Sequence, residues 1–238
     1  MKSIYLLSCE HGGNEIPQEF SYLFKGNEEI LYSHQAIDFG ALRLAYTISE
    51  ESKSSLYKTT ISRLLIECNR SLDNDELFSR FSKKASEKEK GLILENYYYP
   101  HRNGVENAIK EELSNGNNVI HISVHTFTPV IDKEVRDVEV GILFDPLRPG
   151  EKRFYNEIQE SISTTNPSII IKENSPYAGT EDGFTTYLRK KFSAESYSGI
   201  ELEVNQKFFL NGEPQVWQKI TGLLSKTIAA ISRKLSGH

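Results

Sequence analysis

The sequence predicts an α/β fold, a three-layer sandwich around a mixed, largely parallel central sheet. Two observations predict it. Short apolar or β-branched runs, which are typical of strands, alternate along the chain with segments of helical spacing. The 238 residues, 38% hydrophobic and 26% charged, have the length and the ordinary composition of a globular protein. We therefore expect residues 1–238 to form a single domain.

Strands are expected where apolar residues run without interruption or alternate with polar ones, bounded by polar or turn residues. Three of these runs end at residues that can carry chemistry: His11 after the first, Asn69 and Arg70 after the second, and His125 after the third. Because α/β sheets usually place their chemistry at the carboxyl ends of strands, we expect a site there. The expected strands are 3–9, 57–68, 119–124, 138–144, 168–171 and 199–204.

Helices are expected where apolar residues recur at helical spacing or where a capping residue precedes such a pattern. Asp38 falls near the start of the first helix, and Asp182 could cap a later one. The polar and charged segment 71–90 is expected to be a surface excursion or a short helix. The expected helices are 34–49, 103–113, 151–162, 182–192 and 214–235.

Composition excludes several classes of protein. The formal net charge is -5 with a pI near 5.8, and no basic block is dense enough for a nucleic-acid or anionic-membrane binder. Cys9 and Cys68 are the only cysteines, which excludes a disulfide framework and favours a reducing compartment, so a cytoplasmic location is expected. No apolar run is long enough for a signal-peptide core or a membrane span.

The turn after the first expected strand carries His11 and Glu15 around two glycines, which allow the backbone to bring both side chains to one cation. His125 ends the third strand and can reach the same place. Catalytic zinc usually takes three protein ligands and leaves a position for water, and these three residues supply that set. His121 shares a strand face with His125, and we interpret it as a hydrogen-bonded interior histidine.

A hydrolytic site also needs a base and groups that bind the substrate. Glu201 and Glu203 lie on one face of the last expected strand, so one could enter the site while the other pairs with a cation, or both could line a solvated edge. Arg63 and Arg70 lie at the two ends of the apolar run in the second strand, and the planar guanidinium suits a substrate carboxylate. The alternative is a structural ion pair, such as Arg70 with Asp73.

Taken in order, several motifs resemble the N-formylglutamate amidohydrolase family over the range from His11 to Gln206. The family is similar to the zinc carboxypeptidase and aspartoacylase group, in which a histidine with a glutamate, an Asn-Arg pair, a second histidine and a glutamate base follow in that order. The motifs here are HGGNEIP, IDFGALRLA, SRLLIECNR, YYYPHRNGVE, VHTFTP, RDVEVGILFD, NSPYAGT and GIELEVNQ. The resemblance implies a zinc-carboxypeptidase-like (phosphorylase/hydrolase-like) fold over the whole chain.

The resemblance implies one Zn²⁺ per chain, held by His11, Glu15 and His125. The carboxypeptidase pattern has its glutamate three positions after the histidine, where this chain has Asn14, and Glu15 follows one position later. Asp38 is therefore a second candidate for the carboxylate ligand, or a residue that orients a histidine.

The resemblance also implies the catalytic and substrate-binding residues. Glu203 is preferred over Glu201 as the base because it matches the glutamate of the family's Glu-x-Arg motif, although Asn205 replaces the arginine. Asn69 and Arg70 would hold the α-carboxylate. The remaining candidates are Arg136 or Arg63 to polarise the scissile carbonyl or bind a side-chain carboxylate, with Tyr177 and His101 as weaker pocket residues.

The implied reaction is hydrolysis of N-formyl-L-glutamate, a small acidic N-acyl amino acid, to formate and glutamate. Two alternatives remain open. The chain could be an amidase for another N-acyl amino acid or a peptide end, or it could bind zinc and ligand without turnover. The oligomeric state is not indicated by the sequence.

Overall fold

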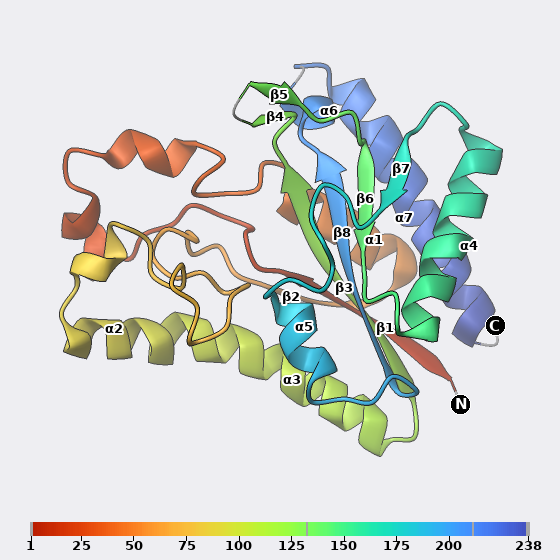
Figure 1. The fold of residues 1–238 in the computed structure, drawn as a ribbon, viewed down its shortest axis with the longest axis horizontal. Coiled ribbons are helices and arrows are strands. Elements are labelled where there is room, and N and C mark those ends of the chain that lie inside the picture. Colours follow the sequence, from red (N-terminus) through yellow and green to blue (C-terminus); the bar gives the residue numbers. More distant parts are fainter. Residues whose placement is uncertain (1, 132, 211, 237–238) are drawn as a thin grey trace.

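The computed structural model describes residues 2–131, 133–210 and 212–236. At its centre is a six-stranded sheet in the order β2-β1-β3-β8-β6-β7 (Figure 1). The strands β2, β1, β3 and β8 are parallel neighbours, β6 runs antiparallel to β8, and β7 is parallel to β6. The strands are β1 Ser3–Cys9, β2 Ser55–Lys58, β3 Asn118–Phe127, β6 Val140–Leu143, β7 Ile171–Glu173 and β8 Tyr197–Asn205. The predicted mixed, largely parallel sheet of an α/β domain is confirmed.

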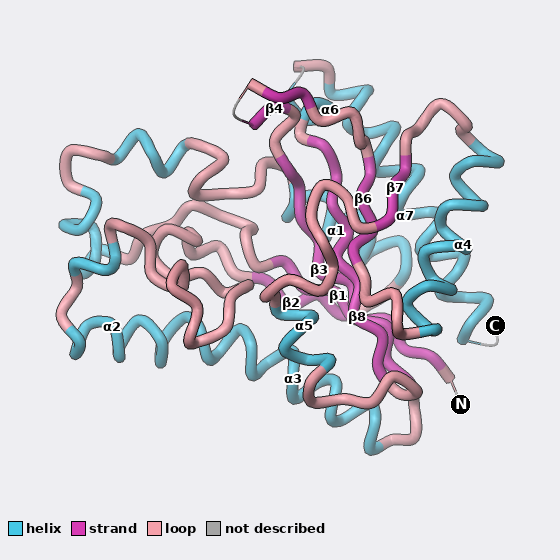
Figure 2. The backbone as a smooth tube through the Cα atoms, in the orientation of Figure 1, coloured by secondary structure: helices cyan, strands magenta, loops and turns pink. Residues whose placement is uncertain are grey.

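Helices cover both faces of the sheet (Figures 1 and 2). One face packs against α1 (Ala41–Ser52), α4 (Pro149–Thr165) and α7 (Pro214–Ser236), and α7 contacts both of the other helices. The other face packs against α3 (Tyr99–Ser114) and α5 (Phe184–Arg189). These are the three layers that the sequence predicted.

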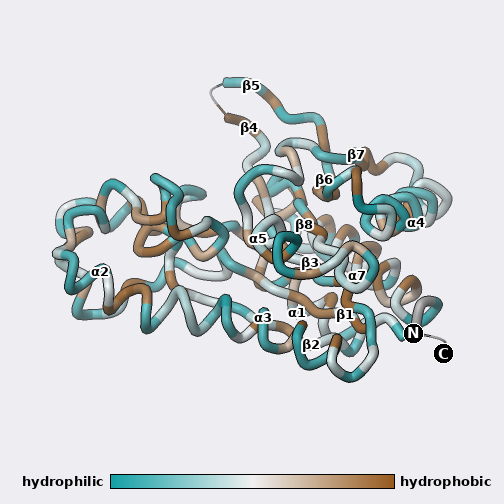
Figure 3. The backbone as a smooth tube through the Cα atoms, turned by 60° about the horizontal axis from the view of Figure 1, so that its bottom comes forward, coloured by the Kyte–Doolittle hydropathy of each residue, from teal (hydrophilic) through white to brown (hydrophobic). Residues whose placement is uncertain are grey.

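The two faces of the sheet differ in character because side chains alternate along each strand. On the face towards α1, α4 and α7, the central strands present mostly apolar residues, such as Leu7, Ile122 and Leu202. In Figure 3 hydrophobic residues concentrate on the central strands. On the opposite face the strands become polar towards their carboxyl ends. The polar residues there are Ser8, Glu10, His121, Ser123, His125, Glu201 and Glu203, all of them buried.

A second region lies beside the sheet, at the left of Figure 1, and has its own hydrophobic core. It contains the short helices η1 (Gln18–Phe24), η2 (Glu28–Tyr32) and η3 (Ser82–Lys84), followed by α2 (Glu87–Ile93). A π-helical turn, η4 (Leu94–Tyr98), joins α2 directly to α3, so the helix predicted over 103–113 begins earlier than expected.

The strand predicted over 57–68 is wrong beyond Lys58, where β2 ends. Residues 59–70 turn away from the sheet, and Ile61 forms only an isolated bridge with Glu15. The apolar residues that suggested a strand, Leu65 and Ile66, are buried in the core of the second region. Burial can therefore account for the apolar run without strand pairing.

Two smaller elements complete the chain. A hairpin of β4 (Val130–Ile131) and β5 (Glu134–Val135) follows β3, and α6 (Lys207–Leu210) follows β8. The sequence did not predict the hairpin, whose strands are only two residues long. Among the residues that the structure describes, no helix combines the length and the apolar character needed to cross a membrane.

Candidate active site

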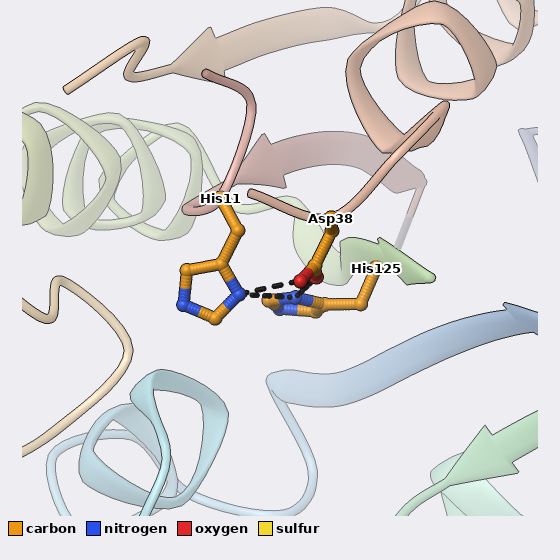
Figure 4. Close-up of side chains that lie close together, drawn as sticks. All are labelled: His11, Asp38 and His125. Atoms are coloured by element: carbon orange, nitrogen blue, oxygen red, sulfur yellow. Dashed lines mark hydrogen bonds and ion pairs between the residues drawn. The ribbon is translucent and has the colours of Figure 1, made fainter. Parts of the chain in front are cut away.

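Two histidines and an aspartate meet at the carboxyl ends of β1 and β3 (Figure 4). His11 follows β1, Asp38 precedes α1, and His125 lies near the end of β3. Asp38 Oδ2 lies 3.1 Å from Nδ1 of His11 and 2.9 Å from Nδ1 of His125. The two Nδ1 atoms are 3.1 Å apart, and all three residues are buried. We call this set the His-Asp-His group.

The backbone around the group explains how distant residues converge. The amide of Asp38 donates to the carbonyl of His11 at 3.2 Å, which joins the segment before α1 to the turn after β1. Gly40 then turns into α1 with a φ of 87°, a conformation that favours glycine. A Cβ at Gly13 would lie 2.3 Å from the carbonyl oxygen of Thr60, so this turn can pack against residues 59–60 only with glycine there.

The outer nitrogen of each imidazole faces a buried carboxylate. Nε2 of His11 lies 2.5 Å from Glu67, and Nε2 of His125 lies 3.1 Å from Glu10. Glu10 also accepts hydrogen bonds from Ser123 at 2.5 Å and His101 at 3.3 Å. A neutral imidazole that donates through Nε2 presents the lone pair of Nδ1. Both lone pairs would then face the point beside Asp38.

The electrostatics of the group favour a positive charge. Burial alone would raise the pKa of Asp38, but His11 and His125 hold it well below its usual range. Burial would likewise lower the pKa of His125, but Asp38 and Glu10 raise it well above its usual value. The pKa of Glu67 is also lowered, against the effect of burial, by Arg63 and His11. Several ionised carboxylates therefore surround two imidazoles.

These residues fit a divalent cation such as zinc. Ligands at about 2.0–2.1 Å from a tetrahedral Zn²⁺ lie about 3.3 Å from one another. The three donor atoms here are 2.9–3.1 Å apart. Carboxylates behind ligating imidazoles are also the arrangement that orients histidines at metal sites.

Glu15, the first carboxylate ligand proposed from the sequence, is not part of the His-Asp-His group. Its side chain is exposed, and Oε2 accepts a hydrogen bond of 2.7 Å from the hydroxyl of Thr60. The bridge between Glu15 and Ile61 keeps this residue beside the segment after β2. The alternative carboxylate considered from the sequence, Asp38, occupies the place between the histidines.

A cavity of about 220 Å³ opens beside the group, and most of the predicted site residues line it. Arg136 and Glu15 do not belong to its lining. Arg136 instead donates to the hydroxyl of Tyr177 at 3.0 Å and lies over the ring of the same residue. The predicted residues in the lining are His11, Asp38, Arg63, Asn69, Arg70, His125, Tyr177, Glu201 and Glu203.

The two glutamates of β8 both line the cavity but differ in their partners. Glu201 accepts a hydrogen bond of 2.6 Å from Thr185. Oε2 of Glu203 is buried and has no hydrogen-bond partner among the described residues. Burial, the largest cause, raises the pKa of Glu203 to about 8, while His125 opposes this shift. Glu203 is therefore the glutamate whose carboxyl group has an oxygen free for proton transfer.

The arginines of the cavity also differ in what they contact. Arg63 forms ion pairs with Glu67 at 2.6 Å and with Asp38 at 3.5 Å. Arg70 pairs with no carboxylate among the described residues. The only hydrogen bond from its side chain to a described residue goes to the main-chain carbonyl of Asp182, at 2.7 Å. The predicted alternative of an ion pair with Asp73 is not found in the described part of the chain.

Some residues of the site were missed from the sequence. Glu10 and Glu67 carry the carboxylates behind the two histidines, yet neither was singled out. Each had a signal. Glu10 directly precedes His11 at a strand end, and Glu67 lies four positions after Arg63 and two before Asn69. His34, Thr126, Phe127, Thr128, Ile131, Leu143, Ala178, Glu181, Asp182 and Gln206 also line the cavity without having been predicted to do so.

The fold and the site together define a class. The chain is an α/β protein that gathers imidazoles and carboxylates around a cavity at the carboxyl ends of its strands, as enzymes of this fold class do. Comparison with known families is more specific. The model of the N-formylglutamate amidohydrolase family matches residues 3–210, and the chain belongs to this family.

Two solved structures resemble the chain over nearly its full length. A gene product of Agrobacterium tumefaciens has a TM-score of 0.81 and 27% sequence identity, with 97% of this chain and 91% of that chain covered. An N-formylglutamate amidohydrolase from Ralstonia eutropha has a TM-score of 0.71 and 14% identity, with 99% and 95% covered. At that identity the second likeness concerns the fold alone. No curated protein sequence matches the chain.

Proposed function

We propose that this protein is a zinc-dependent amidohydrolase that cleaves a small N-acyl amino acid, with N-formyl-L-glutamate as the first candidate substrate. The observation that carries the proposal is the His-Asp-His group beside the unpaired carboxylate of Glu203, both facing one cavity. Membership of the N-formylglutamate amidohydrolase family supports the reaction and the substrate.

Asp38 and the Nδ1 atoms of His11 and His125 would hold one Zn²⁺ per chain, with Asp38 taking the place first given to Glu15. When bound, zinc supplies a Lewis acid that polarises a carbonyl and lowers the pKa of water towards about 7. Glu67 accepts the Nε2 proton of His11, and the Ser123 hydroxyl, which itself donates to Glu10, accepts the Nε2 proton of His125. These contacts keep both rings in the tautomer that a metal needs.

Glu203 would act as the general base and then as the general acid. Its Oε2 has no partner within the described protein, so it can accept the proton of an attacking water. The same carboxyl group then donates this proton to the nitrogen of the leaving amine. The amide bond breaks, a carbon–oxygen bond forms, and the products are a carboxylic acid and a free amino acid.

Asn69 and Arg70 would bind the α-carboxylate of the substrate. Oδ1 of Asn69 accepts from the amide of Phe184 at 2.7 Å, which leaves Nδ2 as a donor. Arg70 uses one guanidinium hydrogen on the carbonyl of Asp182 and keeps the others for the cavity. A guanidinium fork can bind a carboxylate with two parallel hydrogen bonds.

A second candidate is an amidase for an N-acyl amino acid with an uncharged side chain. This candidate is favoured because Arg63 and Arg136 already contact other side chains of the protein. Arg63 pairs with the carboxylates of Glu67 and Asp38, and Arg136 contacts Tyr177 without lining the cavity. Arg70 alone would then bind a substrate carboxylate. In the first candidate, Tyr177, which lines the cavity, would bind the side-chain carboxylate or polarise the scissile carbonyl, with Arg136 donating to its hydroxyl.

The deciding experiment is hydrolysis of N-formyl-L-glutamate by the purified protein, with and without a chelator, followed by restoration with zinc. Release of formate that the chelator abolishes and zinc restores would support reaction and cofactor together. N-formyl derivatives of uncharged amino acids, tested in parallel, separate the two candidates. Stoichiometric zinc with no hydrolysis of any N-acyl amino acid would contradict both and support a role in binding without turnover.

A further inference from the structure

A buried arginine without a counter-ion lies directly behind the proposed carboxylate-binding residues. Arg102 of α3 is 3% exposed, and none of the described residues forms an ion pair with it. Its guanidinium instead lies over three aromatic rings, 4.3 Å from the ring centre of Phe184, 4.4 Å from Tyr187 and 4.9 Å from Tyr98. Because an unpaired buried charge is costly, a specific role is needed to explain this residue.

The hydrogen bonds of Arg102 indicate that role. Its NH1 group donates to the carbonyl of Cys68 at 2.9 Å and to the carbonyl of Arg70 at 3.2 Å. The hydroxyl of Tyr98 donates to this second carbonyl as well, at 2.7 Å. One guanidinium therefore joins both ends of the three-residue segment 68–70, whose last two side chains line the cavity.

The same contacts connect this segment to α5. Phe184 and Tyr187 belong to α5 and face the guanidinium of Arg102. The amide of Phe184 donates to the side chain of Asn69. The Arg70 side chain also donates a hydrogen bond to the carbonyl of Asp182, which lies in the segment just before α5. Arg102 thus lies where α3, α5 and the segment 68–70 meet.

We propose that Arg102 is a positioning residue for substrate recognition, which fixes the segment 68–70 so that Asn69 and Arg70 together receive one carboxylate. The proposal rests on the proposed function for the role of those two residues. Arg102 does not line the cavity, so it acts only through them. A planar donor caged by aromatic rings can hold two carbonyls in fixed positions, which a flexible ammonium group cannot.

The test compares Arg102→Met and Arg102→Lys with the wild-type protein. We measure kcat and KM for N-formyl-L-glutamate, the dissociation constant of the same compound by calorimetry with chelator-treated protein, and the bound zinc. For Arg102→Met we expect KM and the dissociation constant to rise about tenfold or more, with kcat within about threefold, as for lost uniform binding. For Arg102→Lys, KM and the dissociation constant should lie between those of the wild-type protein and Arg102→Met. The zinc content should be the same in all three proteins.

Arg148 provides the matched control. It also donates to main-chain carbonyls, those of Tyr197, Arg189 and Phe192, but it precedes α4 and does not line the cavity. Arg148→Met should lower the melting temperature without raising KM. If Arg102→Met does not fold, Tyr98→Phe removes one hydrogen bond to the carbonyl of Arg70 and should raise KM about threefold, an effect of less than about 1 kcal/mol.

The outcomes separate this proposal from the proposed function. Folded Arg102→Met with unchanged KM and dissociation constant would overturn the positioning role and leave the proposed function intact. The same conclusion would follow if Arg102→Met lost zinc but bound N-formyl-L-glutamate as tightly as the wild-type protein. If the wild-type protein binds N-formyl-L-glutamate without hydrolysing it, the proposed reaction fails, and the dissociation constants still decide the role of Arg102. Wild-type protein that neither binds nor hydrolyses N-formyl-L-glutamate or any other N-acyl amino acid would overturn both.

Discussion

His121 and His125 lie on the same face of β3, four residues apart, yet the groups around the two side chains differ in charge. His121 is fully buried between two neutral hydroxyls, 2.7 Å from Ser8 and 3.0 Å from Tyr197. His125 is equally buried but lies between the carboxylates of Glu10 and Asp38. Burial lowers the pKa of His121 to about 4, whereas the carboxylates raise the pKa of His125 well above its usual value.

This comparison shows that the partners, not the burial, distinguish a structural histidine from a candidate ligand. Neutral partners keep His121 uncharged, and His121 does not line the cavity that contains His125. The interpretation of His121 as a hydrogen-bonded interior histidine is confirmed. The carboxylates beside His125 make its surroundings negative, and a negative environment attracts a metal cation.

The largest effect is expected for His125→Ala. Loss of one of the three proposed ligands should remove zinc from the purified protein and reduce kcat/KM by more than about a thousandfold, since the metal would activate both the water and the carbonyl. Metal analysis alongside formate release checks the prediction. His121→Gln is the matched control and should retain its zinc. A His125→Ala protein with stoichiometric zinc would show that the histidine is not a ligand.

The neighbouring strand offers the same contrast between a paired and an unpaired group. Glu203 pairs in register with His125, and Glu201 lies two residues earlier on the same face. Glu203→Gln should keep the metal and lower kcat by about 10²–10⁴, the range typical of a lost general base. Glu201→Gln should lower kcat far less, because the Glu201 carboxylate already accepts a hydrogen bond from Thr185. Full activity in Glu203→Gln would exclude this residue as the base.

The contrast also shows what the sequence could and could not predict. Parity along each expected strand placed His121 on the face of His125 and Glu201 on the face of Glu203, because strand periodicity is a local property. The register that brings His125 beside Glu203 was found only in the structure. The apolar residues beside Glu67 led to the prediction of a strand there. In the structure these neighbours are buried in the core of the second region and do not pair in the sheet. Asp38 lies 27 residues from His11, and only the closure of the loop before α1 brings the two together. No local pattern encodes that closure.

A moderate effect, on stability and not on catalysis, is expected for His121→Gln. The folded pKa of about 4 lies below the unfolded value of about 6.5, so the unfolded chain binds the proton more tightly. The stability contribution of neutral His121 is therefore complete above about pH 6.5 and is lost as the pH falls towards 4, by up to about 3 kcal/mol.

Urea unfolding of wild type and His121→Gln at several pH values between 4 and 8 measures this contribution. The variant should lose about 1–3 kcal/mol at pH 8 through weaker hydrogen bonding, but its stability should fall less steeply with decreasing pH. Its zinc content and kcat should remain within about twofold of wild type, because His121 is not part of the cavity. Parallel pH profiles for the two proteins would contradict the neutral state assigned to His121.

The smallest effect is expected at Glu15, and it tests which carboxylate belongs to the metal site. Glu15 is exposed and bonds to Thr60, so Glu15→Gln should change zinc content, kcat and stability by less than about twofold or 0.5 kcal/mol, as surface substitutions usually do. Asp38→Asn should instead release zinc, because its carboxylate lies between the two imidazoles. Zinc lost from Glu15→Gln but kept by Asp38→Asn would reverse the assignment and require the turn after β1 to rearrange when metal binds.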